Sequence, residues 1–130
     1  QALLLAKRYW PGPLTLALPL KRPSLLVAGV AVKGEVSVRF SSSKTVQALT
    51  GRFGFPIVAT SANPSGASES HSRKDVVSYF GERLDAIVDG GRLPIRKSST
   101  VLRVREDECC EVIREWAIRL PKKDRQTLSL

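Results

Sequence analysis

The sequence lacks a long apolar run and both standard phosphate-binding loops. The apolar run at residues 2–6 is far shorter than the roughly 18 residues of a membrane-spanning helix. It continues directly into Lys7 and Arg8, without a cleavage site. The motifs GxxxxGK[ST] and GxGxxG do not occur.

Because no apolar run is long enough to span a membrane, we expect a soluble cytoplasmic protein with no membrane contact.

Cysteine and histidine are scarce. The two cysteines, Cys109 and Cys110, are adjacent, and adjacent cysteines rarely form a disulfide with each other. We expect two reduced thiols on a strand. The single histidine, His71, lies in a serine-rich segment without acids or cysteines at metal-ligand spacing. The sequence therefore predicts no metal site and no histidine base.

Acidic residues are rare in the first half of the chain. Residues 1–60 carry eight Lys and Arg against one acid, Glu35, and the 130-residue chain has a net charge of +9. This excess favours an anionic partner, either nucleotide phosphate or RNA, but a solvated basic face explains it equally well. The length and a 42% apolar fraction fit one domain. We place that domain at residues 1–120, followed by a polar tail at residues 121–130.

Helix and strand patterns alternate along the chain. We expect helices at 2–10, 41–54 and after Ser72, strands at 14–20, 35–40, 56–61, 85–91, 99–104 and 109–118, and a short strand or turn within 25–34. Two hairpin-like strands close the sequence. The pattern predicts an α/β fold with a mixed sheet.

The segment after the predicted strand 56–61 is unusually rich in small polar residues. Ser61 and Asn63 are two positions apart, and Pro64 favours extended backbone at Asn63, so both side chains point to the same side. Ser65 and Gly66 can add backbone N–H groups. The segment predicts a ligand site at the end of a strand, or an ordinary Asn-Pro turn.

Further polar groups lie at the ends of other predicted strands. Arg39 ends the strand 35–40 and could bind a phosphate or carboxylate, or simply face solvent. The hydroxyl run at residues 98–100 follows Arg96 and Lys97, a combination that suits an anion.

Six segments in this order resemble the YrdC family of threonylcarbamoyl-AMP synthases. They are YWPGPLTLAL, VSVRF, PIVATSANPSG, DAIVDGG, SSTVL and VIREWAI, and together they cover residues 9–118. The resemblance implies a twisted mixed sheet with helices packed around it and a basic concave cavity. It also implies a nucleotidyltransferase of tRNA threonylcarbamoyladenosine biosynthesis, which converts L-threonine, bicarbonate and ATP to threonylcarbamoyl-AMP and pyrophosphate.

The resemblance further implies site residues and partners. ATP and the adenylate would contact Ser61, Asn63, Arg39, Ser99, Thr100 and Arg114, and threonine would contact Thr15 and Thr60. We expect Ser61 and Asn63 to line the main cavity together with Arg39 and Thr100. No side chain would act as nucleophile or metal ligand, and Mg²⁺ would enter on the ATP phosphates. RNA or tRNA and the machinery that transfers the threonylcarbamoyl group to tRNA would be further partners.

The chain also departs from the family pattern. The family's Lys-x-Arg segment, upstream of Trp-Pro-Gly-Pro, has no counterpart, because Lys7-Arg8 has the wrong spacing. Trp116 stands in the place of a glycine, and Ser98 stands where acids are common. We therefore expect the C-terminal two-thirds of such an enzyme, as an inactive or partial fragment. The alternatives are a non-catalytic RNA-binding module of the same fold, or a carbamoyltransferase-type domain of hydrogenase maturation.

Overall fold

The computed structural model of this chain describes residues 1–22, 29–121 and 124. The expected segment within 25–34 and the expected tail from residue 121 lie partly outside the described residues. The chain divides into two compact units, one of residues 1–57 and 97–130 and the other of residues 58–96. The first unit contains the sheet, and the second contains a helix and its flanking loops.

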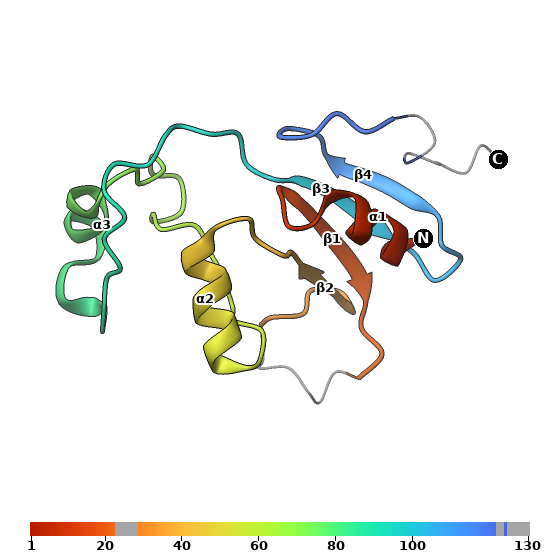
Figure 1. Ribbon diagram of the computed structural model, residues 1–130, viewed down its shortest axis with the longest axis horizontal. Helices are drawn as coiled ribbons and strands as arrows, with labels where there is room; N and C mark the ends of the chain where they lie inside the picture. Colours follow the sequence, from red (N-terminus) through yellow and green to blue (C-terminus); the bar gives the residue numbers. More distant parts are fainter. Residues whose placement is uncertain (23–28, 122–123, 125–130) are drawn as a thin grey trace. The chain divides into compact units, whose positions relative to one another are not determined.

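The first unit is built on a four-stranded mixed sheet (Figure 1). Its strands are β1 (Leu14–Pro19), β2 (Glu35–Val38), β3 (Thr100–Val104) and β4 (Cys110–Arg114), in the spatial order β2-β1-β3-β4. β1 pairs antiparallel with β2 and parallel with β3, and β3 pairs antiparallel with β4. The prediction of an α/β fold with a mixed sheet is confirmed.

Helix α1 (Ala2–Tyr9) covers one face of this sheet (Figure 1). Alternation along β3 turns Thr100, Leu102 and Val104 to the buried side. Leu5 of α1 is 2% exposed and packs in the same cluster. The buried members of this core are Leu5, Leu14, Leu16, Leu102, Val104, Cys110 and Leu120. The opposite face of the sheet carries most of its polar side chains.

The turn between α1 and β1 brings backbone atoms very close together. A Cβ atom on Gly12 would lie 2.3 Å from the Tyr9 carbonyl oxygen, so only glycine fits there. The Gly12 N–H donates to the Phe40 carbonyl at 2.9 Å, and the Trp10 Nε1–H donates to the Leu14 carbonyl at 2.7 Å. These bonds tie the turn to the start of β1 and to the chain just after β2.

Helix α2 (Lys44–Phe53) lies within the predicted range 41–54 and has a capping residue at each end. The hydroxyl of Ser43 accepts from the Val46 N–H, and Gly54 takes a left-handed conformation with φ of 71°. None of the residues of α2 is buried. The amphipathic pattern predicted the helix correctly. The apolar side of the helix is nevertheless accessible to solvent.

The second unit holds α3 (Arg73–Phe80) and the short 3₁₀ helix η2 (Gly81–Arg83). The helix predicted after Ser72 is confirmed, and the Ser72 hydroxyl caps it by accepting from the Asp75 N–H at 3.3 Å. The Asp75 carboxylate accepts from the His71 N–H at 2.9 Å. The first bond satisfies a free N–H group of the first helical turn, and the second ties the chain before the helix to that turn.

The strands predicted at 56–61 and 85–91 are wrong, because the structure has irregular backbone there. A strand needs a neighbour for its backbone N–H and C=O groups, and neither segment pairs with another among the described residues. Ile57 and Val58 are 41% and 69% exposed, so burial does not hold them in place either. An apolar run in the sequence does not show whether a second strand is available to pair with it.

Candidate functional site

The parallel pairing of β1 and β3 brings two hydroxyl residues together at the start of both strands. Leu14 pairs with Thr100, so Thr15 and Ser99 become neighbours although 84 residues separate them. Their hydroxyl oxygens lie 2.9 Å apart and share a hydrogen bond. Ser99 is 9% exposed, and Thr15 is half-buried. Two predicted site residues from distant segments thus meet at one edge of the sheet.

Arg114, the last residue of β4, completes this group. Its Nε–H donates to the Ser99 carbonyl at 3.0 Å, and its Nη2 donates to the Ser99 hydroxyl at 3.4 Å. Its guanidinium carbon lies 4.8 Å from the centre of the Trp116 ring. We call Thr15, Ser99, Arg114 and Trp116 the Arg114 corner.

Arg39 lies close to this corner in the sheet. Val38, the last residue of β2, pairs with Leu16, so the next residue along, Arg39, falls beside Thr15 in the antiparallel register. Arg39 is exposed and makes no hydrogen bond or ion pair with the described residues. The backbone therefore carries a second cation to the same edge of the sheet.

Thr100 occupies a different environment from its neighbour Ser99. It is fully buried, at 0% exposure. Its hydroxyl accepts from the N–H groups of Trp116 and Ile118, at 3.2 and 2.9 Å, and donates to the Ile118 carbonyl at 2.9 Å. A hydroxyl has one proton to donate and two lone pairs, so its capacity is filled. Thr100 lies in the core, and a direct ligand contact by this residue stays a prediction.

The loop of residues 60–67 belongs to the second unit. The Asn63 Nδ2 donates to the carbonyls of Ala67 at 2.9 Å and Pro64 at 3.2 Å, which closes the turn that the Asn-Pro pair predicted. Its Oδ1 atom is buried and has no partner within the described part of the chain. Thr60 and Ser61 are exposed, with the Thr60 hydroxyl donating to the Ser61 carbonyl at 3.4 Å. That this loop shares a cavity with Arg39 and Thr100 stays a prediction.

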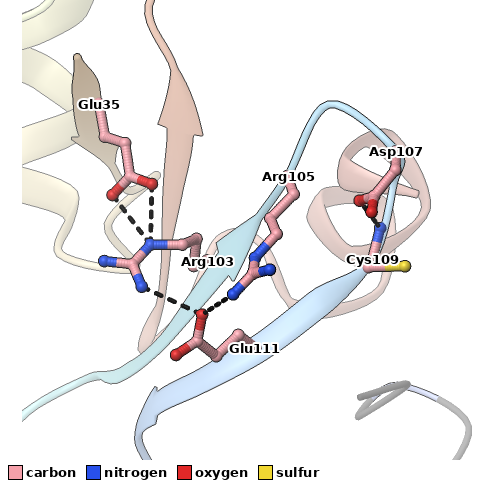
Figure 2. A network of polar contacts seen from close by, with 6 residues as sticks. All are labelled: Glu35, Arg103, Arg105, Asp107, Cys109 and Glu111. Atoms are coloured by element: carbon pink, nitrogen blue, oxygen red, sulfur yellow. Dashed lines mark hydrogen bonds and ion pairs between the residues drawn. The ribbon is translucent and has the colours of Figure 1, made fainter. Parts of the chain in front are cut away.

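A second polar cluster lies farther along the same sheet (Figure 2). The Arg103 guanidinium on β3 contacts Glu35 of β2 at 2.8 Å and Glu111 of β4 at 3.1 Å. Arg105 donates to the same Glu111 carboxylate at 2.9 Å. We call these four residues the Arg103 network. Hydrogen bonds from Arg105 and Arg103 lower the pKa of Glu111, and the bonds to Glu35 and Glu111 raise the pKa of Arg103.

The cysteines lie beside this network, where β4 begins. Both thiols are free, with Cys110 buried and Cys109 half-buried. The Cys109 N–H donates to the Asp107 carboxylate at 3.0 Å (Figure 2). Desolvation raises the pKa of both thiols, so they stay protonated and weakly nucleophilic. Neither cysteine contacts the Arg114 corner.

Three further features concern metals, membranes and cavities. Among the described residues, no three His, Cys, Asp or Glu side chains are placed to hold a metal ion. In the same part of the chain, no helix is both long and apolar enough to cross a membrane. A depression of about 350 Å³ is lined by Gln1, Leu4, Leu5, Arg8 and Asp124, and none of the predicted site residues lines it.

Sequence reasoning missed two features of this sheet. In the sequence, Trp116 was noted only because it replaces a glycine of the family pattern, and no role was predicted for it. The Arg103 network was not anticipated, although Glu35, Arg103 and Glu111 lie on strands that alternate in polarity. Their pairing depends on the strand order, which a sequence pattern does not give.

The comparisons with known proteins agree with the α/β fold. A family model, Sua5_yciO_yrdC, described as "Telomere recombination", matches residues 1–115. The chain therefore belongs to the Sua5/YciO/YrdC family of α/β proteins.

Two of the curated relatives are named threonylcarbamoyl-AMP synthase. The threonylcarbamoyl-AMP synthase of Marinobacter nauticus is 35% identical over 99 residues, which is 76% of this chain and 52% of the relative. The enzyme of the same name from Bacillus subtilis is 38% identical over 107 residues, or 82% of this chain and 31% of the relative. The chain thus spans about a third to a half of the curated relatives that it matches.

Solved structures extend the comparison to three dimensions. The crystal structure of Pyrococcus abyssi Sua5 complexed with L-threonine matches with a TM-score of 0.67 and 38% identity, covering 78% of this chain and 30% of that one. A doubly substituted variant of P. abyssi Sua5 matches with a TM-score of 0.78 and 34% identity, covering 95% of this chain and 37% of that one.

Proposed function

We propose that this chain carries part of the substrate site of a threonylcarbamoyl-AMP synthase. The observation that carries the proposal is the meeting of Thr15, Ser99 and Arg114, three predicted site residues from three strands or strand ends. The names of the relatives and the threonine complex of a structural neighbour support the same activity. The substrates would be L-threonine, bicarbonate and ATP.

The Arg114 corner suits the phosphate end of ATP. The Nε and Nη2 groups of Arg114 donate hydrogen bonds to Ser99, while its Nη1 group has no hydrogen bond within the described residues. A guanidinium offers five protons in a planar fork that matches phosphate oxygens. Arg39, carried beside Thr15 by the strand register, adds a second cation. Mg²⁺ is proposed to enter on the ATP phosphates, whose hard oxygens it prefers.

The proposed reaction asks the protein for positioning and charge stabilisation. The threonine amine attacks bicarbonate, which gives a carbamate and water. A carbamate oxygen then attacks the α-phosphorus of ATP, the bond from that phosphorus to the bridging oxygen breaks, and pyrophosphate leaves with the electron pair. Guanidinium groups at the phosphates stabilise the charge that develops in this step. Neither step needs a protein nucleophile.

The remaining predicted residues have narrower parts in the proposal. Asn63 and Ser61 would contact the nucleotide, and the buried Asn63 Oδ1 atom, which has no partner among the described residues, would need a small movement of the loop to accept from it. Thr15 and Thr60 would contact threonine. Thr100 would act indirectly, because its buried hydroxyl holds the backbone at Trp116 and Ile118.

The test is pyrophosphate release by the full 130-residue chain, together with calorimetric titration of ATP. ATP binding that falls in Arg114→Gln and Asn63→Ala, but not in Arg103→Gln, supports the proposal. Pyrophosphate release is expected to require both threonine and bicarbonate. Absence of ATP binding, or ATP affinity that is the same in all three variants, contradicts the assignment of this site.

RNA binding is a second candidate function, favoured by the exposure of the basic residues. All eight Lys and Arg side chains between residues 1 and 60 are exposed, and among the described residues only Arg8 of these eight forms an ion pair, with Asp124. Phosphate-driven binding weakens steeply with salt. We expect weak RNA binding that is lost between low and moderate salt, and when Lys7, Arg8, Lys21 and Arg22 are neutralised together. Binding that resists both changes contradicts this candidate.

A further inference from the structure

The Arg114 side chain is held on two sides. On one side, Ser99 accepts two of its protons through its carbonyl and its hydroxyl. On the other side, the guanidinium carbon lies 4.8 Å from the centre of the Trp116 ring, within the range of a cation–π contact. Ser99 thus holds one edge of the guanidinium, and the indole ring lies against it.

Trp116 is anchored through its backbone and not through its ring. Its N–H donates to the buried Thr100 hydroxyl, so the core fixes where the side chain starts. The residue is 54% exposed and does not belong to the core cluster. A half-exposed tryptophan gains little from burial, so core packing does not account for its place.

We propose that Trp116 is a positioning residue whose indole ring holds the Arg114 guanidinium in a single orientation before an anionic ligand binds. The inference rests on the proposed function for the identity of that ligand, the phosphate groups of ATP. Long arginine side chains lose conformational freedom when they bind, and a guanidinium already held by a ring and a serine loses less. Trp116 thus raises anion affinity without contacting the anion.

The first experiment measures Arg114 itself in the free protein. In the ¹⁵N-labelled full chain, the Arg114 Nε–H signal should show an upfield ring-current shift and slow exchange with water. Trp116→Leu should remove the shift and speed the exchange several-fold, while Trp116→Phe, which keeps an aromatic face, should preserve most of both. Circular dichroism checks that each variant is folded. An Arg114 signal that is unchanged in Trp116→Leu overturns the inference.

The second experiment separates positioning from ligand contact by a double-mutant cycle. With ATP and inorganic triphosphate as probes, Trp116→Leu should weaken binding about two- to fivefold, and Trp116→Phe should restore most of the loss. In an Arg114→Gln background, Trp116→Leu should have no further effect. An equal loss in that background means that the ring contacts the ligand directly, which overturns the inference. If the wild-type chain binds neither probe, the proposed function fails, and the Arg114 signal still decides whether Trp116 positions it.

Discussion

Arg103 and Arg114 lie on neighbouring strands of one sheet and are held in different ways. Arg103 on β3 is bracketed by the carboxylates of Glu35 and Glu111, which neutralise it across three strands. Arg114 at the end of β4 is held by Ser99 and Trp116, and no carboxylate pairs with it among the described residues. One guanidinium has its counter-ions within the protein, and the other has neutral partners among the described residues.

This difference separates a structural cation from a candidate binding cation. An arginine whose donors are taken by two carboxylates has little to offer an incoming phosphate. An arginine fixed by neutral groups keeps both its charge and free protons, in a defined orientation. The two positions therefore predict opposite responses to substitution.

The largest expected effect is on stability, and it comes from Thr100, whose buried hydroxyl holds the backbone at Trp116 in the Arg114 corner. Thr100→Val removes a buried hydroxyl and leaves the N–H groups of Trp116 and Ile118 without their acceptor. We expect the free energy of unfolding to fall by about 2–4 kcal/mol, measured by urea denaturation. Thr45→Val, at an exposed threonine in the first turn of α2, is the matched control and should change stability by less than about 0.5 kcal/mol. A loss below about 1 kcal/mol for Thr100→Val would mean that water replaces the hydroxyl.

The next effect tests the comparison directly. Arg114→Gln should weaken ATP binding by about 10- to 100-fold, since charge-assisted hydrogen bonds are lost, and should change stability little. Arg103→Gln should lower the urea midpoint, because Glu35 and Glu111 lose their shared partner, and should change ATP affinity by less than about twofold. Calorimetric titration and urea unfolding of both variants form a two-by-two test. Equal effects on both readouts would remove the distinction between the two arginines.

The smallest effect is the pH dependence of the Arg103 network. The lowered pKa of Glu111 means that its ionised form stabilises the folded state above the ordinary glutamate pKa, and that this stabilisation is lost as pH falls through the lowered value. The wild-type chain should therefore lose stability on acidification more steeply than Glu111→Gln, and the two should converge at low pH. Urea midpoints measured from about pH 6 down to about pH 2.5 check this.

The matched control for the acid titration is Glu106→Gln, at an exposed glutamate without an ion pair in the described part of the chain. This variant should follow the wild-type curve. Parallel curves for wild type and Glu111→Gln would show that the network contributes nothing to acid sensitivity.

The sequence by itself determined the local elements that depend on near neighbours. Ser43 and Gly54 bound α2, Ser72 caps α3, and the alternation along 100–104 predicts β3, because caps and side-chain periods act within a few residues. The order of the six segments that resemble the YrdC family also identified the family. Irregular backbone at 56–61 could not be predicted, since a strand exists only where a second strand pairs with it.

Only the tertiary structure decided which residues meet. Thr15 and Ser99 touch across 84 positions of sequence because β1 and β3 pair in parallel with one particular register. The same register turns Ser99 toward Arg114 and its neighbour Thr100 into the core, although the two residues looked equivalent in the sequence. Successive side chains of a strand point to opposite faces, so a shift of one position would have exchanged their roles. That choice depends on the packing of the whole sheet against α1, which no local pattern contains.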